Sequence, residues 1–242
     1  MRVLSWNLYH GRDFPPDPTL FTLRARLLRR TERNDTHVQV NRPLLEEFAR
    51  VLDGLEWDVA LLQEAPPRWF GELQRRIGAA GARTLTSRNL LPPVQGALAD
   101  FNPDLMASWE GGSNQILVRA SGRIAEHREL TLTRRPERRR MHFARLELPG
   151  AGPLCVANLH ATAGRPARAA AEMLAAAEAA VAWSGNVPLV FGGDLNLRPA
   201  SDPEPFARLD ERFGLREPTA PDAIDHVLAR GLDVAEPPRR RG

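Results

Sequence analysis

The chain has 242 residues, 43% of them hydrophobic, which is enough apolar material for the core of one large α/β or sandwich domain. Its single cysteine, Cys155, excludes a disulfide framework and suits a small core residue. No run approaches the roughly 18 apolar residues that a membrane span needs, and the N-terminus does not resemble a secretory signal. We therefore expect a cytoplasmic protein with no membrane span, and we expect a monomer.

All 33 basic residues are arginines, yet the formal net charge is only +3. Many of the arginines gather in three clusters, over residues 24–33, 134–140 and 239–241. Such clusters can hold phosphate groups through paired N–H donors and can attract polyanions. They can equally be solvated faces, and the sequence leaves both interpretations open.

In the first half of the chain, apolar runs over residues 3–8 and 57–62 predict buried strands. Residues 12–42 are rich in proline, arginine and polar groups, which predicts a long loop with a short helix. Pro43 suits the first turn of a helix that ends near Gly54. A further helix is predicted over 68–77, and residues 81–112 carry few regular signals.

The second half of the chain predicts further strands and one long alanine-rich helix, over residues 166–183. Its predicted strands cover residues 115–119, 124–133, 141–148, 154–159, 187–191 and 224–228, the second and third as an antiparallel pair. This alternation of strands, helices and hairpins predicts a mixed sheet, or two packed sheets, with helices outside.

Polar side chains stand where the predicted strands end, at Asn7, Glu64, His160, Asp194 and Asn196. Sheets fix positions and the following loops expose them, so strand ends are favourable places for a functional site. Glu64 and Asp194 could supply the carboxylates that Mg²⁺ prefers, and the two asparagines could supply neutral oxygens. Each residue alone is more often a turn former, a solvated carboxylate or a core histidine, so the prediction depends on their occurring together and in order.

Five short motifs in order resemble those of the endonuclease/exonuclease/phosphatase superfamily. They are Ser5-Trp6-Asn7, Leu62-Gln63-Glu64, Asn158-Leu159-His160, Gly193-Asp194-Leu195-Asn196 and Ile224-Asp225-His226-Val227, and residues 112–119 resemble the family's mid-chain strand. The resemblance covers nearly the whole chain. It implies a single domain over residues 1–242, folded as a four-layer α/β sandwich in which two mixed sheets pack face to face with helices outside.

The resemblance also implies a role for each matching residue. Glu64 would be the principal ligand of Mg²⁺, with Mn²⁺ as an alternative, and Asn7 and Asp194 would complete the metal site. Asp194 would orient or activate the attacking water, and Asn196 would contact the scissile phosphate. His160 would hydrogen-bond a phosphate oxygen or assist the leaving group.

The end of the chain departs from the family pattern. Asp225 and His226 match the earlier of two late motifs, and the later Ser-Asp-His motif and its strand do not follow. We therefore expect a domain that lacks its last strand and has weak activity, in which Asp225 supports the site and His226 is incidental. The alternative is that His226 does the catalytic work in a shortened fold. Glu217 is the candidate for orienting a catalytic histidine.

The implied function is a Mg²⁺-dependent phosphoesterase that hydrolyses phosphodiester bonds, with DNA or RNA as candidate substrates. Two alternatives stay open: a phosphoesterase for a small molecule or lipid headgroup, and a non-catalytic relative that binds phosphate or nucleic acid. A steep loss of binding with added salt would distinguish a polyanionic substrate from a small one.

Overall fold

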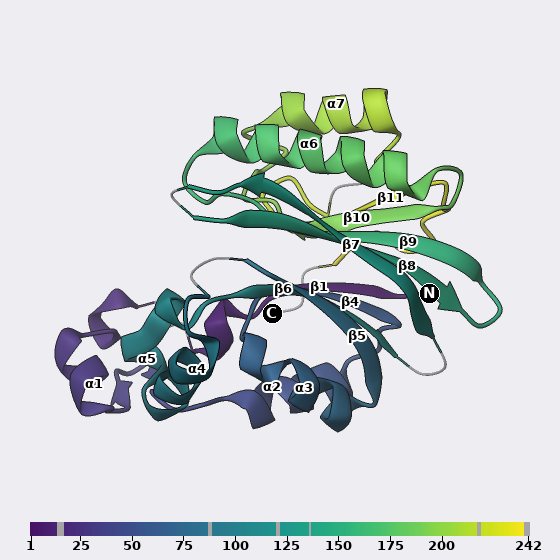
Figure 1. Cartoon of the computed structure of the whole chain (residues 1–242). Helices are drawn as coiled ribbons and strands as arrows, with labels where there is room; N and C mark the ends of the chain where they lie inside the picture. Colours follow the sequence, from purple (N-terminus) through teal and green to yellow (C-terminus); the bar gives the residue numbers. More distant parts are fainter. Residues whose placement is uncertain (14–16, 87–88, 120–121, 136, 217–218, 240–242) are drawn as a thin grey trace.

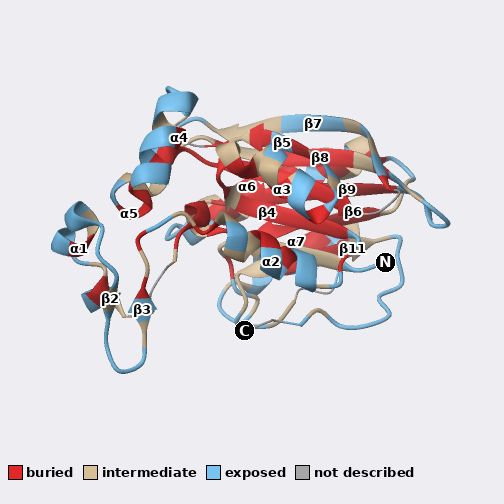
Figure 2. Ribbon diagram, turned by 90° about the horizontal axis from the view of Figure 1, so that it is seen from below, coloured by how far each residue is buried: buried red, intermediate tan, exposed pale blue. Residues whose placement is uncertain are grey.

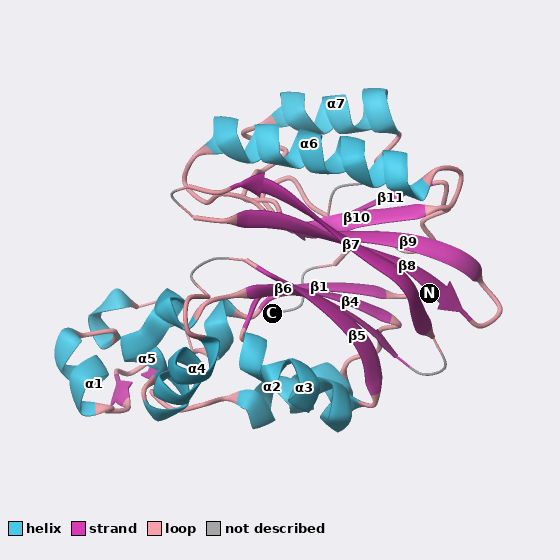
Figure 3. Ribbon diagram, in the orientation of Figure 1, coloured by secondary structure: helices cyan, strands magenta, loops and turns pink. Residues whose placement is uncertain are grey.

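A computed structural model describes residues 1–13, 17–86, 89–119, 122–135, 137–216 and 219–239. Two β-sheets pack face to face in the middle of the molecule, and helices cover their outer surfaces (Figure 1). Figure 3 shows the same succession of helix, sheet, sheet and helix layers. The predicted four-layer α/β sandwich is therefore confirmed.

The first sheet has four strands in the order β1-β4-β6-β5. The strands are β1 (Val3–Asn7), β4 (Val59–Ala65), β5 (Ala79–Leu85) and β6 (Ser113–Arg119). Strands β1 and β4 run parallel, and the other two pairings are antiparallel. The carboxyl ends of β1 and β4 therefore lie at the same edge of this sheet.

The second sheet has five strands in the order β11-β10-β9-β8-β7. The strands are β7 (Arg123–Thr133), β8 (Arg139–Leu148), β9 (Gly152–His160), β10 (Leu189–Asp194) and β11 (Asp225–Arg230). Strands β9 and β10 are parallel, so their carboxyl ends also share an edge. Strands β7 and β8 form the antiparallel pair that the sequence predicts.

Helices α2 (Leu45–Gly54) and α3 (Phe70–Ile77) cover the first sheet, and α6 (Pro166–Ser184) and α7 (Pro203–Phe213) cover the second (Figure 1). A lobe at one end holds the remaining regular segments. These are α1 (Leu23–Leu28), α4 (Pro92–Phe101), α5 (Pro103–Met106), the 3₁₀ turns η2 (Pro18–Leu20) and η4 (Ala107–Glu110), and the short strands β2 (Glu32–Arg33) and β3 (Val38–Gln39). Two further 3₁₀ turns, η1 (Tyr9–Gly11) and η3 (Pro67–Trp69), follow β1 and β4.

Side-chain alternation along the strands divides the core into three apolar clusters, one between the sheets and one beneath each helix layer. Leu61 points between the sheets, whereas Leu62 packs towards α2 and α3. Figure 2 shows strands β4, β6, β8 and β9 among the most buried parts of the molecule. Cys155 lies fully buried beneath α6, as a small core residue.

A buried polar network joins the two sheets beside the ends of the parallel strands. Gln63 of β4 donates a 2.7 Å hydrogen bond to the side-chain oxygen of Asn158 in β9. The Asn158 amide nitrogen donates in turn to the carbonyl oxygens of Leu62 and Gln115, both at 2.9 Å. Because unpaired buried amides are costly, this network favours one relative position of the sheets.

The structure differs from the sequence-based expectation in three segments. Residues 12–42 contain a β2–β3 pairing as well as the short helix α1, and residues 81–112 hold most of β5 together with α4, α5 and η4. Helix α7 was not predicted, although Phe206, Leu209 and Phe213 stand at helical spacing after a proline-rich first turn. Within the described ranges, no helix is long and apolar enough to cross a membrane.

Gly193 allows β9 and β10 to approach each other next to Asp194. Its φ is +124°, and a Cβ placed there would lie 2.0 Å from the carbonyl oxygen of Leu159. We expect Gly193→Ala to lower the free energy of unfolding by about 2–4 kcal/mol, from backbone strain and overpacking together. Gly150→Ala is the matched control, because Gly150 also has positive φ but has open space around it. Equal losses in the two variants, measured by urea unfolding, would contradict this account.

Candidate active site

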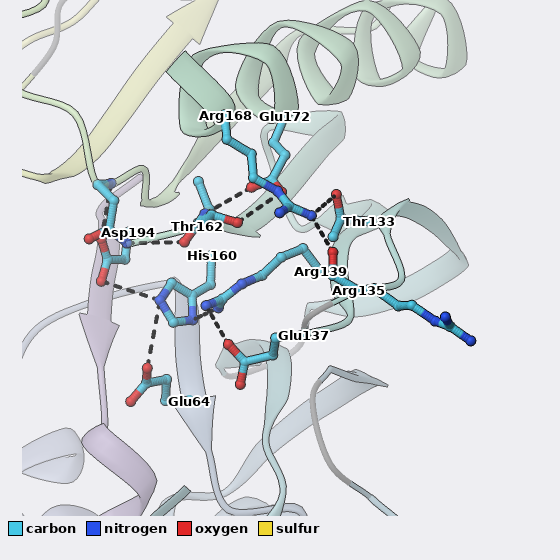
Figure 4. Close-up of polar contacts among 12 residues, drawn as sticks. Glu64, Thr133, Arg135, Glu137, Arg139, His160, Thr162, Arg168, Glu172 and Asp194 are labelled. Carbon is cyan, nitrogen blue, oxygen red and sulfur yellow. Dashed lines mark hydrogen bonds and ion pairs between the residues drawn. The ribbon is translucent and has the colours of Figure 1, made fainter. Parts of the chain in front are cut away.

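The candidate site lies where the carboxyl ends of β1, β4, β9 and β10 meet across the gap between the sheets. Figure 4 shows the His160 ring between the carboxylates of Glu64 and Asp194. The His160 Nε2 atom is 3.6 Å from Glu64 Oε1 and 3.7 Å from Asp194 Oδ2. Asn7 Nδ2 donates a 3.0 Å hydrogen bond to Asp194 Oδ2, which ties the first sheet to the second. The structure thus brings together four of the side chains that the sequence predicts.

Asn7 is oriented by the turn that ends β1. Its side-chain oxygen accepts a 2.9 Å hydrogen bond from the backbone N–H of Tyr9, an arrangement that asparagine commonly makes with the chain two residues on. Tyr9 and His10 then both take left-handed φ values. The Asn7 amide therefore presents its nitrogen to Asp194 and its oxygen to the turn.

Glu64 is directed into the site by an irregularity in β4. The pairing of β4 with β6 shifts register between Leu62 and Ala65, and Glu64 has φ of +45°. Regular alternation would turn Glu64 away from Gln63, which points between the sheets. The bulge re-aims the carboxylate, and such local strain is common at functional sites.

Asp194 and Asn196 follow β10 and contact each other through the backbone. Asp194 Oδ1 accepts a 3.1 Å hydrogen bond from the Asn196 N–H, while Asn196 Nδ2 donates to the carbonyl oxygen of Ala161 at 3.1 Å. Asn196 has φ of +52°. Asp194 therefore accepts one hydrogen bond on each oxygen before any substrate binds.

His160 is held in one tautomer by Arg139. The Arg139 Nη1 atom lies 3.0 Å from His160 Nδ1, and because a guanidinium can only donate, Nδ1 must accept. The imidazole proton is then on Nε2, which faces the two carboxylates. Burial, together with the positive charge of Arg139, holds the pKa of His160 well below its usual value. His160 is therefore a neutral N–H donor, and Glu137 accepts a 2.7 Å hydrogen bond from the same guanidinium.

Burial raises the proton affinity of both carboxylates. Burial, reinforced by the negative charge of Asp194, raises the pKa of Glu64 to about 7. Burial also raises the pKa of Asp194, although the hydrogen bonds from Asn7 and Asn196 oppose the shift. A pair of carboxylates with raised pKa values at strand ends is typical of a functional site.

His10 and Arg139 are site residues that the sequence reasoning missed. The ring of His10 is buried, its Nδ1 donates to the carbonyl oxygen of Gly111 at 3.0 Å, and its Nε2 lies 3.5 Å from Glu64 Oε2. Burial and the charge of Arg12 lower the pKa of His10 to about 4. His10 follows Asn7 by three residues, a signal that was available, whereas Arg139 was one of five clustered arginines.

The two residues of the late motif, Asp225 and His226, lie in different surroundings. Asp225 pairs in register with Asp194 on the neighbouring strand, so it borders the site. His226 points the other way: its Nε2 lies 2.9 Å from the Ala223 carbonyl oxygen, its Nδ1 accepts from the Thr219 N–H, and its ring contacts Phe206 of α7. The structure does not bring the His226 ring to the carboxylates. Glu217 lies outside the described residues.

Among the described residues, no group of three or more His, Cys, Asp or Glu side chains forms a ready metal site. The donors that are present still suit a hydrated divalent cation, since Mg²⁺ often binds through one or two carboxylates and keeps several waters. Burial and the neighbouring charge of Asp194 raise the pKa of Glu64, and a bound cation would offset both effects. Glu64 and Asp194 are therefore the residues able to hold Mg²⁺.

Comparison with solved structures identifies the same fold in several bacterial proteins. An endonuclease/exonuclease/phosphatase from Bacteroides vulgatus superposes with a TM-score of 0.61 at 13% identity, covering 95% of this chain and 87% of that one. A mannosyl-6-phosphatase from Bacteroides thetaiotaomicron gives 0.60 at 12% identity, with coverage of 96% and 85%. An endonuclease/exonuclease/phosphatase from Beutenbergia cavernae gives 0.63 at 17% identity, with coverage of 95% and 64%.

A search of curated proteins found no match to this chain. The sequence model described as "Endonuclease/Exonuclease/phosphatase family", in contrast, matches residues 4–241. That range contains Asn7, Glu64, His160 and Asp194, the side chains that meet at the strand ends. The chain therefore belongs to the endonuclease/exonuclease/phosphatase family, whose members are phosphoester hydrolases.

Proposed function

We propose that this protein is a Mg²⁺-dependent phosphodiesterase, with Mn²⁺ as an alternative metal and a nucleic acid as its first candidate substrate. The observation that carries the proposal is the convergence of Glu64, Asp194 and the N–H donor of His160 at one point between the sheets. Phosphoryl transfer depends on positioning and on charge placed against the phosphate oxygens, and this site offers both.

Glu64 and Asp194 would hold the metal ion, which would neutralise charge on the phosphate oxygens. Asp194 orients the attacking water and accepts its proton, and burial favours this because it raises the pKa of the carboxylate. His160, fixed as an Nε2–H donor by Arg139, hydrogen-bonds a phosphate oxygen. Asp225 borders Asp194 and supports it, whereas His226 belongs to the packing against α7.

The two asparagines have different proposed roles. Asn7 donates its amide N–H to Asp194, and an amide nitrogen does not ligate a cation, so we assign it to positioning Asp194. The Asn196 amide nitrogen carries a second hydrogen besides the one donated to Ala161. That second hydrogen is available for a non-bridging phosphate oxygen.

A phosphatase acting on a small phosphomonoester is the second candidate. Its support is the shared fold with a protein described as a mannosyl-6-phosphatase, which shows that this scaffold accommodates monoester chemistry. Parallel assays on a phosphodiester and a phosphomonoester separate the two candidates, and hydrolysis of the monoester alone would overturn the proposed diesterase.

Removal of either carboxylate should abolish Mg²⁺-dependent hydrolysis. We expect Glu64→Gln and Asp194→Asn each to lower kcat/KM for bis(p-nitrophenyl) phosphate and for plasmid DNA by about 10²–10⁴-fold. Glu204→Gln is the matched control, because Glu204 is an exposed carboxylate on α7, in the outer layer. Full activity of both site variants, or wild-type activity in excess EDTA, would contradict the proposal.

Loss of the Arg139 guanidinium should change the tautomer of the His160 ring and leave the fold intact. In Arg139→Met, His160 loses the donor that fixes its tautomer, so we expect kcat to fall by about 10–100-fold. The ¹⁵N chemical shifts of the His160 ring should show a mixture of tautomers. Arg139→Lys should partly restore both kcat and the single tautomer. An unchanged tautomer together with reduced kcat would contradict the positioning role of Arg139.

The carboxylate pair predicts an unusual dependence of stability on pH in the metal-free protein. The folded-state pKa of Glu64, about 7, lies above its ordinary value of 4.5, so between these values the folded chain binds more protons than the unfolded chain. The free energy of unfolding should therefore fall as the pH rises from 4.5 to 7, by about 3 kcal/mol from this group.

Glu64→Gln removes this titration and should flatten the corresponding part of the profile. Urea unfolding in EDTA at pH 5 and pH 8 measures the effect in both proteins. Subtracting the result for Glu64→Gln from that for the wild type cancels the pH dependence of all the other groups. Added Mg²⁺ should restore wild-type stability at pH 8 but not that of the variant. Identical pH slopes in the two proteins would show that Glu64 does not carry the raised pKa.

A further inference from the structure

The lobe at the end of the sandwich is built from two separate connecting segments. Residues 17–42 lie between β1 and α2, and residues 89–112 lie between β5 and β6. We call these two segments together the arginine-leucine lobe. Figure 1 shows it beside the sheets, and Figure 2 shows much of its surface, including α1 and α4, as exposed.

Helix α4 turns its apolar side to solvent. Val94, Leu98 and Phe101 stand at positions i, i+4 and i+7 of the helix, which places them on one face. All three are exposed, Phe101 by 63%, while the small residues Gly96 and Ala99 are buried. An amphipathic helix normally presents its apolar face to the core, whereas α4 presents its apolar face to solvent.

Helix α1 repeats the pattern and adds positive charge. Leu23, Leu27 and Leu28 are all more than half exposed. The exposed arginines around them are Arg24, Arg29, Arg30 and Arg33. Helix α1 therefore combines solvent-exposed leucines with a basic border, whereas α4 carries no arginine of its own.

Exposed apolar residues concentrate in this lobe. Of the 15 large hydrophobic residues that are exposed in the described chain, 11 lie in it. They are Leu23, Leu27, Leu28, Val38, Leu90, Leu91, Val94, Leu98, Phe101, Leu105 and Trp109. A gathering of large exposed apolar side chains in one part of a protein points to an interaction site.

The lobe is nevertheless held by specific contacts. Asn102 Nδ2 donates to the Arg26 carbonyl oxygen at 2.8 Å, and the Arg29 guanidinium stacks over the Phe101 ring at 4.3 Å. Asn41 Nδ2 donates to Asn102 Oδ1 at 3.0 Å, which is a further contact between the two segments of the lobe. The apolar side chains are therefore presented outwards by a packed framework.

The composition of the surface selects among possible partners. Nine of the 11 exposed residues are aliphatic, whereas binding of single-stranded nucleic acid relies on aromatic side chains for base stacking. Self-association through this face would bring the arginines of two copies together. The aliphatic anchors, together with the arginines of the α1 segment, match the interface of a bilayer that contains anionic lipids.

We propose that the arginine-leucine lobe is a docking surface for anionic lipid membranes. The leucines of α1 and α4 insert among the acyl chains, and the arginines contact the lipid phosphates. The lobe ends next to the site, since His10 donates to the Gly111 carbonyl oxygen and lies 3.5 Å from Glu64. Docking would therefore bring the candidate site near lipid headgroups; hydrolysis of a headgroup rests on the proposed function, but binding does not.

Vesicle co-sedimentation of the full chain tests the docking directly. We expect partition onto phosphatidylcholine vesicles containing about one third phosphatidylserine, and much weaker partition onto phosphatidylcholine alone. The double variant Leu98→Ser/Phe101→Ser should lower the partition coefficient by about tenfold or more. Arg24→Gln/Arg30→Gln should lower it by about fivefold for each arginine removed, on the anionic vesicles only.

The matched control is Val51→Ser/Val234→Ser, which removes two exposed apolar side chains outside the lobe and should leave partition unchanged. Trp109, 60% exposed in the lobe, gives a second readout: its fluorescence should shift to the blue with anionic vesicles, and Trp109→Phe should lose the shift. Unchanged urea midpoints establish that each variant is folded.

Several results would overturn the proposal. These are absence of wild-type partition onto anionic vesicles, partition that the lobe variants do not reduce, and lobe-dependent binding to a single-stranded oligonucleotide or to a second copy without vesicle binding. Hydrolysis of soluble bis(p-nitrophenyl) phosphate is measured separately with the same lobe variants, which should keep the wild-type rate. Vesicle binding without any hydrolysis would overturn the proposed function and leave the docking surface standing.

Discussion

The arrangement of the site depends on the hydrogen bonds that Asn158 makes between the two sheets. Gln63 immediately precedes Glu64, and Asn158 lies two residues before His160, so the 2.7 Å bond between their side chains fixes the distance between the strand ends. The carbonyl oxygens of Leu62 and Gln115 complete the network. A slide of one sheet over the other would leave buried amides unpaired, and apolar packing alone would not resist it as specifically.

Much of the site was predictable because it lies at the ends of strands that have clear apolar patterns. Asn7, Glu64, His160 and Asp194 each follow a buried run, and parallel pairing brings such ends to one edge. The orientation of their side chains was not predictable. The bulge that turns Glu64 inwards depends on a positive φ at a residue that does not favour it, and the Asn7 amide is oriented by a turn at Tyr9. These features arise from tertiary constraint, which local propensity does not encode.

The remaining failures have equally specific causes. Arg139 stands among five neighbouring arginines, and only the alternation of β8 shows which of them points to His160. The motif at Asp225 and His226 allowed two interpretations, and the backbone carbonyl contacts of the His226 ring support the one in which it is a core residue. Helix α4 escaped prediction because Pro92, Pro93 and Gly96 weaken the helical signal.

The separation of the lobe from the sheets has an evolutionary consequence. One segment of the lobe connects β1 to α2 and the other connects β5 to β6. Their length and composition can therefore change without altering any strand register. The residues proposed to act on a phosphate and the surface proposed to dock on membranes therefore lie in different stretches of the chain. Exchange of the two segments would redirect the same chemistry to another location. Selection could therefore act on the location of the protein and on its reactivity independently.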